Sequence, residues 1–375
     1  MPNGNNERIR LAAITTSRSD FTSLEPVLRG ALADDRFDAQ LLVCGQHLVA
    51  NTPLPEEIAG LPAMRLASSP DAVDWISQKA LSGALRDRRT DVAFLVGDRF
   101  ELLSVAECCT LSGVSIAHCS GGDRTFGAFD DQVRDAITKL AHLHFVAHDL
   151  GAKRIASLQE EPWRIAVTGD PGLDTISRET QLTPQDLEGL LGVRPAKTDI
   201  VVAIHPVTRS TEETASCLRV VSRFCEDFEG HVFLSAPNGD PGSDVISTTW
   251  LELSSRMPRC QCFSSLGGKA FRSLVAACGV LVGNSSAGVW EAPSLGTPSL
   301  DLGSRQSGRI RGNTVWASGA DGVDDVAGKL RHLLSPEVQT ACRNGVNPYG
   351  DGNATPRILE HIARHMRDPR LMLKS

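Results

Sequence analysis

Residues 91–123, DVAFLVGDRFELLSVAECCTLSGVSIAHCSGGD, decide the fold. Two apolar runs, DVAFLVGD and GVSIAHCS, flank a segment that continues as a helical pattern, and polar residues follow each run. Short apolar runs bounded by turns and separated by helices are typical of parallel strands in a βαβ unit. This stretch therefore predicts an α/β fold with a parallel sheet.

The same alternation recurs on both sides of this unit. Apolar runs stand at IRLAAITT, DAQLLVCG, LHFVAH and RIAVTGD, and again at IVVAIHP, HVFLSAPN, CGVLVGNSS and TPSLDLG. The polar segment LTPQDLEGLLGVRPAKTD separates the two series, and 375 residues exceed one ordinary domain. We predict two Rossmann-like doubly wound lobes facing a cleft, with ligands beyond the carboxyl ends of the strands.

The predicted domains are an N-terminal lobe at 1–180 and a C-terminal lobe at 181–354. A C-terminal helix at 355–375 is expected to pack back on the N-terminal lobe. Thr355 is its predicted N-cap, and Pro356 takes the first helical position.

Composition narrows the classes of function. A net charge of -7 and the absence of a basic stripe argue against nucleic acid as a partner. The polar start MPNGNNERIR and the lack of a long apolar run predict no membrane association. Ten scattered cysteines, several within apolar runs, favour a reducing cytoplasm, and the C-x-C of Cys260 and Cys262 lacks the second cluster that a zinc site needs.

Polar residues cluster at the predicted strand ends of the first lobe. Arg18 lies among hydroxyls before a helix, an arrangement that suits an anion, whereas Ser19 or Asp20 could equally serve only as a helix cap. Asp98 and Arg99 follow the next candidate strand. Three aspartates in GGDRTFGAFDDQ either cap and solubilise a loop or carry out proton chemistry, namely Asp123, Asp130 and Asp131.

The second lobe shows signs of an anion site. His205 ends one strand, and in GNSSAGVWE small side chains and bare backbone N–H groups stand at a helix start, where a diphosphate could bind. Glu291 is placed one turn further on, to accept from sugar hydroxyls. Three arginines in GSRQSGRIRG add a local positive charge to an acidic chain, namely Arg305, Arg309 and Arg311.

Taken together, these motifs resemble the hydrolysing UDP-N-acetylglucosamine 2-epimerase family of sialic- and legionaminic-acid pathways. The resemblance is collinear from about residue 10 to 365 and includes TTSRSDF, CGQHL, GDRFELLS, TGDPGLD, HPVT, APNGDPG, GNSSAGVWEAPSLGTP and NPYGDGNA. It implies a GT-B pair of lobes, no metal or redox cofactor, a nucleotide-sugar substrate and a homodimer or homotetramer. The implied reaction eliminates UDP to leave a glycal, which water converts to N-acetylmannosamine or a close relative.

The resemblance also assigns roles to residues. Asp98 and Asp130 match acidic residues that act in the reaction, with Asp123, Asp131 and His205 as further catalytic candidates. His205 and Arg305 are expected near the diphosphate and Glu291 on the ribose. The nucleotide-binding positions are Arg18, Thr22, Arg99, His205, Asn238, Ser285, Ser286, Glu291 and Arg305.

One departure from the family stands out. The loop HCSGGD reads more like HIEGGE in relatives, so that Ser120 occupies the place of a catalytic glutamate. Either Asp123 or Asp131 takes over the lost role, or the protein acts differently on a similar nucleotide sugar. Two alternatives therefore stay open: a nucleotide-sugar hydrolase or glycosyltransferase on the same scaffold, and a non-catalytic nucleotide-sugar binder.

Overall fold

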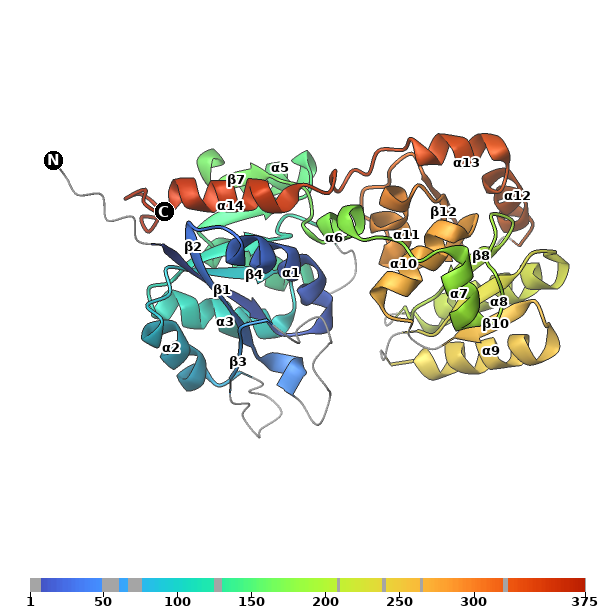
Figure 1. The fold of residues 1–375 in the computed structure, drawn as a ribbon, viewed down its shortest axis with the longest axis horizontal. Helices are drawn as coiled ribbons and strands as arrows, with labels where there is room; N and C mark the ends of the chain where they lie inside the picture. Colours follow the sequence, from blue (N-terminus) through green and yellow to red (C-terminus); the bar gives the residue numbers. More distant parts are fainter. Residues whose placement is uncertain are drawn as a thin grey trace. The chain divides into compact units, whose positions relative to one another are not determined.

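Two parallel β-sheets, one in each of two structural units, organise the protein (Figure 1). The computed structural model describes residues 8–48, 61–66, 76–124, 130–207, 210–237, 241–263, 266–319 and 323–374. Among the described residues, the first unit comprises those up to 124, 130–175 and 349–374, and the second comprises those between 176 and 348. Parallel sheets with helices on both faces confirm the predicted doubly wound α/β class.

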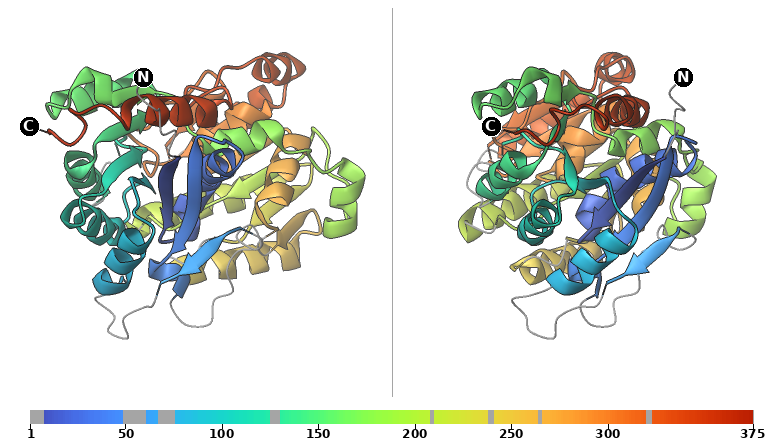
Figure 2. Two further views of the ribbon diagram at one scale, coloured as in Figure 1. Left: turned by 60° about the vertical axis from the view of Figure 1, so that its left-hand side comes forward. Right: turned by 90° about the vertical axis from the view of Figure 1, so that its left-hand side faces the viewer.

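The first sheet has the strand order β3-β2-β1-β4-β5-β6-β7, with β3 at its outer edge (Figure 2). All its strand pairs are parallel. The strands are β1 (Ile9–Thr15), β2 (Phe37–Val43), β3 (Ala63–Arg65), β4 (Val92–Val96), β5 (Ser115–Cys119), β6 (Leu143–Val146) and β7 (Ile165–Val167).

Helices cover both faces of this sheet because alternate strand residues point to opposite sides. Phe94 and Val96 belong to one hydrophobic cluster, and Ala93 and Leu95 to the other. The helical segments of the unit are α1 (Arg18–Leu32), η1 (Gly45–Leu48), α2 (Gln78–Asp87), α3 (Phe100–Leu111), α4 (Asp130–Leu140), α5 (Asp149–Ser157), η3 (Pro162–Arg164) and α14 (Ala354–His365). The helix α6 (Gly172–Arg178) carries the chain into the second unit.

The second sheet has the order β10-β9-β8-β11-β12-β13 and is also parallel. Its strands are β8 (Ile200–Ala203), β9 (Val232–Ser235), β10 (Cys260–Phe263), β11 (Val280–Gly283), β12 (Ser299–Leu302) and β13 (Val315–Ser318). Its helical segments are α7 (Pro184–Leu191), α8 (Thr211–Asp227), α9 (Ser243–Arg256), α10 (Gly268–Ala277), α11 (Ser286–Trp290), η4 (Ala292–Leu295), α12 (Val323–Leu333) and α13 (Pro336–Arg343).

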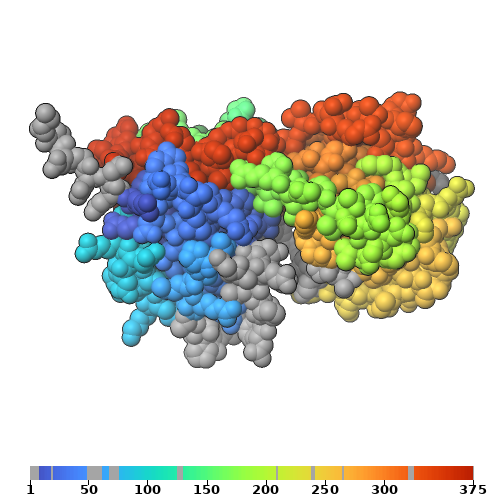
Figure 3. All heavy atoms as spheres, viewed as in Figure 1, coloured from blue at the N-terminus to red at the C-terminus, as the bar shows by residue number. Residues whose placement is uncertain are grey.

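The C-terminal helix α14 lies against α1 in the first unit (Figure 3). Its apolar stripe, Ile358, Leu359 and Ile362, is buried in the cluster that covers one face of the first sheet. The helix begins at Ala354, so Thr355 is not its N-cap as predicted. The side chain of Asp174 accepts hydrogen bonds from the backbone N–H groups of Ala354 (2.9 Å) and Thr355 (2.7 Å), and therefore supplies the cap from a distant part of the sequence.

Two features are absent from the described ranges. No helix there is both long enough and apolar enough to cross a bilayer. No group of three or more His, Cys, Asp or Glu side chains among the same residues is arranged to hold a metal ion.

Candidate active site

Two neighbouring strands of the first sheet end in acidic loops. β4 and β5 pair in parallel with Val96 opposite Cys119, and the backbone N–H of Gly97 donates to the Cys119 carbonyl at 3.0 Å. The loops that follow therefore leave the sheet at the same edge. They carry Asp98 and Asp123, which is why strand-end reasoning could place both residues together.

Arg134 of α4 ties these loops to the start of its own helix. Its guanidinium forms ion pairs with Asp98 and with Asp131 (Nη1–Oδ1 2.5 Å), and Nη1 donates to the Asp123 carbonyl at 2.8 Å. Only 3% of the Arg134 side chain is exposed, against 28% for Asp98 and 21% for Asp131. A buried guanidinium needs such partners, so Arg134 organises what we name the acidic cluster, Asp98, Asp123, Asp130 and Asp131.

The environment of Asp130 alters its affinity for protons. Burial raises the pKa of Asp130 above its ordinary range, and the charge of Asp98 raises it further, whereas Arg134 and Arg99 lower it. A carboxyl group in this balance can both release and take up a proton nearer neutrality than an exposed aspartate.

Arg99 also belongs to this neighbourhood. It is the N-cap residue of α3, and its Nε lies 3.4 Å from Oε2 of the buried Glu101. Its charge lowers the pKa of Asp130, so Arg99 lies close to the acidic cluster. The residues that the structure brings together at one edge of the first sheet are therefore Asp98, Arg99, Asp123, Asp130 and Asp131.

Ser120 lies on the same edge, directly after β5, in a left-handed backbone conformation with φ of 65°. Its hydroxyl contacts the Cys119 sulfur at 3.8 Å. A serine here offers no carboxylate, and the left-handed region costs a residue with a Cβ about 1 kcal/mol or more.

The start of α1 is held by a buried carboxyl group. Asp20 accepts hydrogen bonds from the Thr15 hydroxyl (2.5 Å) and from the backbone N–H groups of Thr16 (2.8 Å) and Ser17 (3.1 Å). Burial raises the pKa of Asp20 to about 6, although these hydrogen bonds lower it. The N-cap of α1 is Ser17, so the prediction of Ser19 or Asp20 as the cap is wrong, and Asp20 contributes instead as the N3 carboxylate of the capping box.

Three predicted nucleotide contacts are less well defined. The backbone of Arg18 begins α1, but its side chain lies outside the described part of the structure. Thr22 is half-buried one turn later in the same helix. Asn238 falls outside the described residues.

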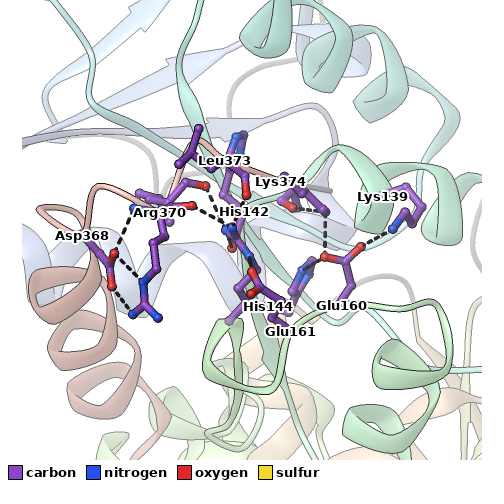
Figure 4. A network of polar contacts seen from close by, with 12 residues as sticks. Lys139, His142, His144, Glu160, Glu161, Asp368, Arg370, Leu373 and Lys374 are labelled. Atoms are coloured by element: carbon purple, nitrogen blue, oxygen red, sulfur yellow. Dashed lines mark hydrogen bonds and ion pairs between the residues drawn. The ribbon is translucent and has the colours of Figure 1, made fainter.

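The far end of α4 is fixed by the C-terminal segment (Figure 4). The Lys374 ammonium donates to the carbonyls of Thr138 (3.0 Å) and Ala141 and pairs with Glu160 (2.9 Å), which Lys139 also contacts at 2.7 Å. Cations at a helix C-terminus are favourable. Both ends of the helix that supplies Arg134 are thus held by charged side chains.

In the second unit, Asn284 joins the loops that follow β8 and β11. Its Oδ1 accepts from the His205 backbone N–H at 2.7 Å, and its Nδ2 donates to the His205 carbonyl at 2.8 Å. Asn284 is fully buried. The paired bonds fix the backbone of His205 at the carboxyl edge of the sheet.

Gly283 permits this close approach. Its φ is 139°, and a Cβ built there would lie 2.0 Å from the Ala203 carbonyl oxygen. After Asn284, the Ser285 hydroxyl caps α11 by accepting from the Ala287 N–H at 3.3 Å, and Ser286 begins the helix. The small residues predicted at this helix start are therefore present in the expected place.

The three predicted arginines gather around a buried carboxyl group at β12. Arg311 pairs with Asp301 (Nη2–Oδ2 2.5 Å). Burial raises the pKa of Asp301, and the charges of Arg311, Arg309 and Arg305 lower it. Arg305 also donates to the Asn284 carbonyl at 3.1 Å. The segment with the three arginines therefore contacts Asn284, the residue that fixes the backbone of His205.

Glu291 lies in a different polar group. Its Oε1 is 3.8 Å from Nη1 of Arg272, which pairs with Glu179 at 2.9 Å. Burial raises the pKa of Glu291 to about 7, Arg272 lowers it, and Glu179 raises it. Glu291 is therefore a buried carboxyl group whose charge is partly balanced by Arg272.

Sequence reasoning missed Arg134, Asn284 and Arg272. The spacing of Arg134, four residues after Asp130 and three after Asp131, places all three on one helix face and could have indicated the contact. Asn284 and Arg272 gave no comparable signal, because their partners come from distant segments.

Comparison with known proteins identifies the family. The sequence model of the family described as UDP-N-acetylglucosamine 2-epimerase matches residues 31–363. The chain belongs to this family and is an enzyme of the UDP-N-acetylglucosamine 2-epimerase type, which confirms the resemblance drawn from the strand-end motifs.

Individual relatives carry two kinds of name. The chain is 30% identical to GDP/UDP-N,N'-diacetylbacillosamine 2-epimerase (hydrolyzing) of Campylobacter jejuni, over 67% of this chain and 66% of that protein. It is 27% identical to UDP-N,N'-diacetylbacillosamine 2-epimerase (hydrolyzing) of Legionella pneumophila, over 95% and 97%. It is 28% identical to UDP-N-acetylglucosamine 2-epimerase of Neisseria meningitidis, over 82% of each.

Solved structures share the fold. S. aureus MnaA with UDP matches with a TM-score of 0.77 at 17% identity, over 96% of this chain and 97% of that one. N. meningitidis UDP-GlcNAc 2-epimerase bound to UDP-GlcNAc matches with a TM-score of 0.75 at 16% identity, over 95% and 100%.

Proposed function

We propose that this protein is a hydrolysing 2-epimerase that converts a UDP-activated 2-acetamido sugar and water to UDP and the free sugar inverted at C2. The observation that supports it best is the acidic cluster around Arg134, because inversion at C2 requires groups that remove and return a proton, and carboxyl groups can do both. The default substrate is UDP-N-acetylglucosamine.

The first step of the proposed reaction is elimination. A base takes the proton from C2, the C1–O bond to UDP breaks, and a glycal remains. Asp98, Asp123, Asp130 and Asp131 are the proposed carriers of this proton. Asp130 fits the role because its raised pKa lets it accept and later release a proton.

The second unit is proposed to hold UDP. Arg305 and its neighbouring arginines would balance the charge of the departing diphosphate, together with His205 and the N–H groups at Ser285 and Ser286. Glu291 is proposed to hydrogen-bond the ribose. We retain Arg18, Thr22, Arg99 and Asn238 as further nucleotide contacts.

Hydration completes the reaction. The oxygen of water adds to C1, and a proton returns to C2 on the face opposite to that from which the first one left. One water is consumed, and free sugar and UDP are formed. No redox cofactor is required by this balance. We further propose a homodimer or homotetramer, and a cytoplasmic location in keeping with ten cysteines that form no disulfide bond in the described part of the structure.

A panel of substrates tests which sugar the protein accepts and whether the nucleotide is released. UDP-N-acetylglucosamine, UDP-N,N'-diacetylbacillosamine and their GDP counterparts would be incubated with the protein, and the products resolved by chromatography and NMR. The proposal expects free UDP together with a free C2-inverted sugar. A product still attached to UDP would identify a non-hydrolysing epimerase instead.

Ser120 favours a second candidate, a nucleotide-sugar hydrolase or glycosyltransferase, because serine supplies no carboxylate where the family resemblance implies a catalytic glutamate. UDP release with retained configuration at C2 would support that candidate. Tight UDP binding without turnover of any sugar in the panel would indicate a non-catalytic binder.

Replacing Asp130 by asparagine removes the proton-exchanging group while keeping its size. We expect kcat to fall at least about 100-fold, with UDP affinity by calorimetry within about twofold of the original protein. Because the pKa of Asp130 is raised, the acidic limb of the kcat/KM profile should lie above the ordinary aspartate range near 3.9. Asp35→Asn, at a fully exposed side chain, is the control; equal activity of the two variants would exclude Asp130 from the reaction.

A further inference from the structure

His148 stands at the end of β6 and caps the next helix with its ring. It is the N-cap residue of α5, and its Nδ1 accepts a hydrogen bond from the Gly151 N–H at 3.0 Å. A nitrogen that accepts a hydrogen bond carries no proton, so the proton of the neutral ring is on Nε2. The cap therefore fixes which nitrogen can donate.

That donor faces the acidic cluster. Nε2 of His148 lies 3.3 Å from Oδ1 of Asp123. The backbone carbonyl of Asp123 accepts from Arg134 at 2.8 Å and from Arg154, so the main chain that carries this carboxyl group is fixed. The ring is 13% exposed and the carboxyl group 31%, which leaves the acid, but hardly the imidazole, open to a substrate.

Gly122 makes the contact possible. Its φ is 78°, and a Cβ built there would lie 2.4 Å from the Gly151 carbonyl oxygen and 2.9 Å from its carbonyl carbon. Only glycine lets the loop after β5 lie directly on the first turn of α5. This approach brings Asp123 against His148.

A third contact fixes the plane of the ring. The imidazole of His148 packs edge-on against the Tyr349 ring, with centroids 5.6 Å apart and an angle of 70°. Serine, threonine, aspartate or asparagine would cap a helix with a shorter side chain. Histidine differs from these residues by its second ring nitrogen, which in this structure contacts the Asp123 carboxyl group.

We propose that His148 is a positioning residue that holds the Asp123 carboxylate, through the Nε2–H, in the orientation in which Asp123 exchanges protons with the sugar. This role rests on the proposed 2-epimerase function and assigns Asp123 a working partner within the acidic cluster. In this role His148 donates a hydrogen bond and does not itself react with the sugar.

Two substitutions separate the two nitrogens of the ring. His148→Asn keeps an acceptor at the place of Nδ1 and loses the donor at Nε2. His148→Gln keeps a donor near Nε2 and loses the cap. We expect His148→Asn to lower kcat about 10- to 100-fold with little change in KM or Tm. His148→Gln should recover at least about tenfold of that loss in kcat while lowering Tm by about 2 to 4 °C.

The outcomes are distinct. Equal losses of kcat in the two variants, or a loss only in the less stable one, would reduce His148 to a structural cap and overturn the proposal. If the original protein inverts no sugar in the panel, the proposed function fails first. Independently of turnover, nitrogen-15 NMR of histidine-labelled protein should show the Nε2–H tautomer of His148, and the Nδ1–H tautomer would contradict the contact.

Discussion

Replacing Arg134 by methionine is expected to abolish most of the activity and to destabilise the first unit. The buried guanidinium is the common partner of Asp98, Asp131 and the Asp123 carbonyl. Without it, the carboxylates repel one another and leave the geometry that proton transfer needs. We expect kcat to fall at least about 100-fold and the free energy of unfolding to drop by about 2 to 4 kcal/mol.

Steady-state kinetics and differential scanning calorimetry measure these two effects. Arg29→Met is the matched control, because Arg29 pairs with Glu25 on the surface of α1 and is 54% exposed; such pairs contribute about 0.5 kcal/mol. The kcat and the stability of Arg134→Lys should lie between those of Arg134→Met and Arg29→Met. An ammonium group keeps the positive charge but cannot form all the hydrogen bonds that the guanidinium forms. Full activity in Arg134→Met would contradict the central place given to this arginine.

Replacing Gly283 by alanine is expected to disrupt the second unit and its proposed nucleotide site together. The new Cβ would meet the Ala203 carbonyl oxygen at 2.0 Å, and alanine at a φ of 139° is strained in any surroundings. β8 and β11 must then move apart, which breaks the paired bonds between Asn284 and His205. We expect a loss of more than about 3 kcal/mol in stability and at least about tenfold weaker UDP binding.

The control for this change is Gly328→Ala in α12, where a Cβ would meet no atom within 4 Å. Alanine in a helix is favoured over glycine by about 0.5 to 1 kcal/mol, so this variant should melt slightly higher than the original protein. If Gly283→Ala melts like the control and binds UDP normally, the described packing of β8 on β11 is wrong.

The fold class was largely predictable because a parallel strand buried on both faces is a continuous apolar run. Of the strands in the described ranges, three were not predicted, and all of them are edge strands: β3, β10 and β13. An edge strand has one neighbour and can be short and exposed, as in β3, where Ala63, Met64 and Arg65 are all exposed. The cap of α14 was not predicted for another reason, because Asp174, which supplies it, lies far from this helix in the sequence.

The acidic residues were predictable because they follow strands directly, and strand ends meet at one edge of a parallel sheet. The side chains that contact the candidate site residues could not be predicted from the sequence. Arg134, Asn284 and His148 act through side-chain contacts between loops and helices, and such contacts depend on backbone approaches such as those at Gly122 and Gly283. Such close backbone approaches produce no repeating pattern in the sequence from which they could be predicted.

Proton exchange at C2 is the central claim, and isotope incorporation tests it most directly. The protein would be incubated with UDP-N-acetylglucosamine, or with whichever panel sugar releases UDP, in deuterated water, and the free sugar examined by NMR. We predict one deuterium at C2 of a free sugar with inverted C2 configuration. UDP release with a fully protonated C2 of unchanged configuration would contradict the account.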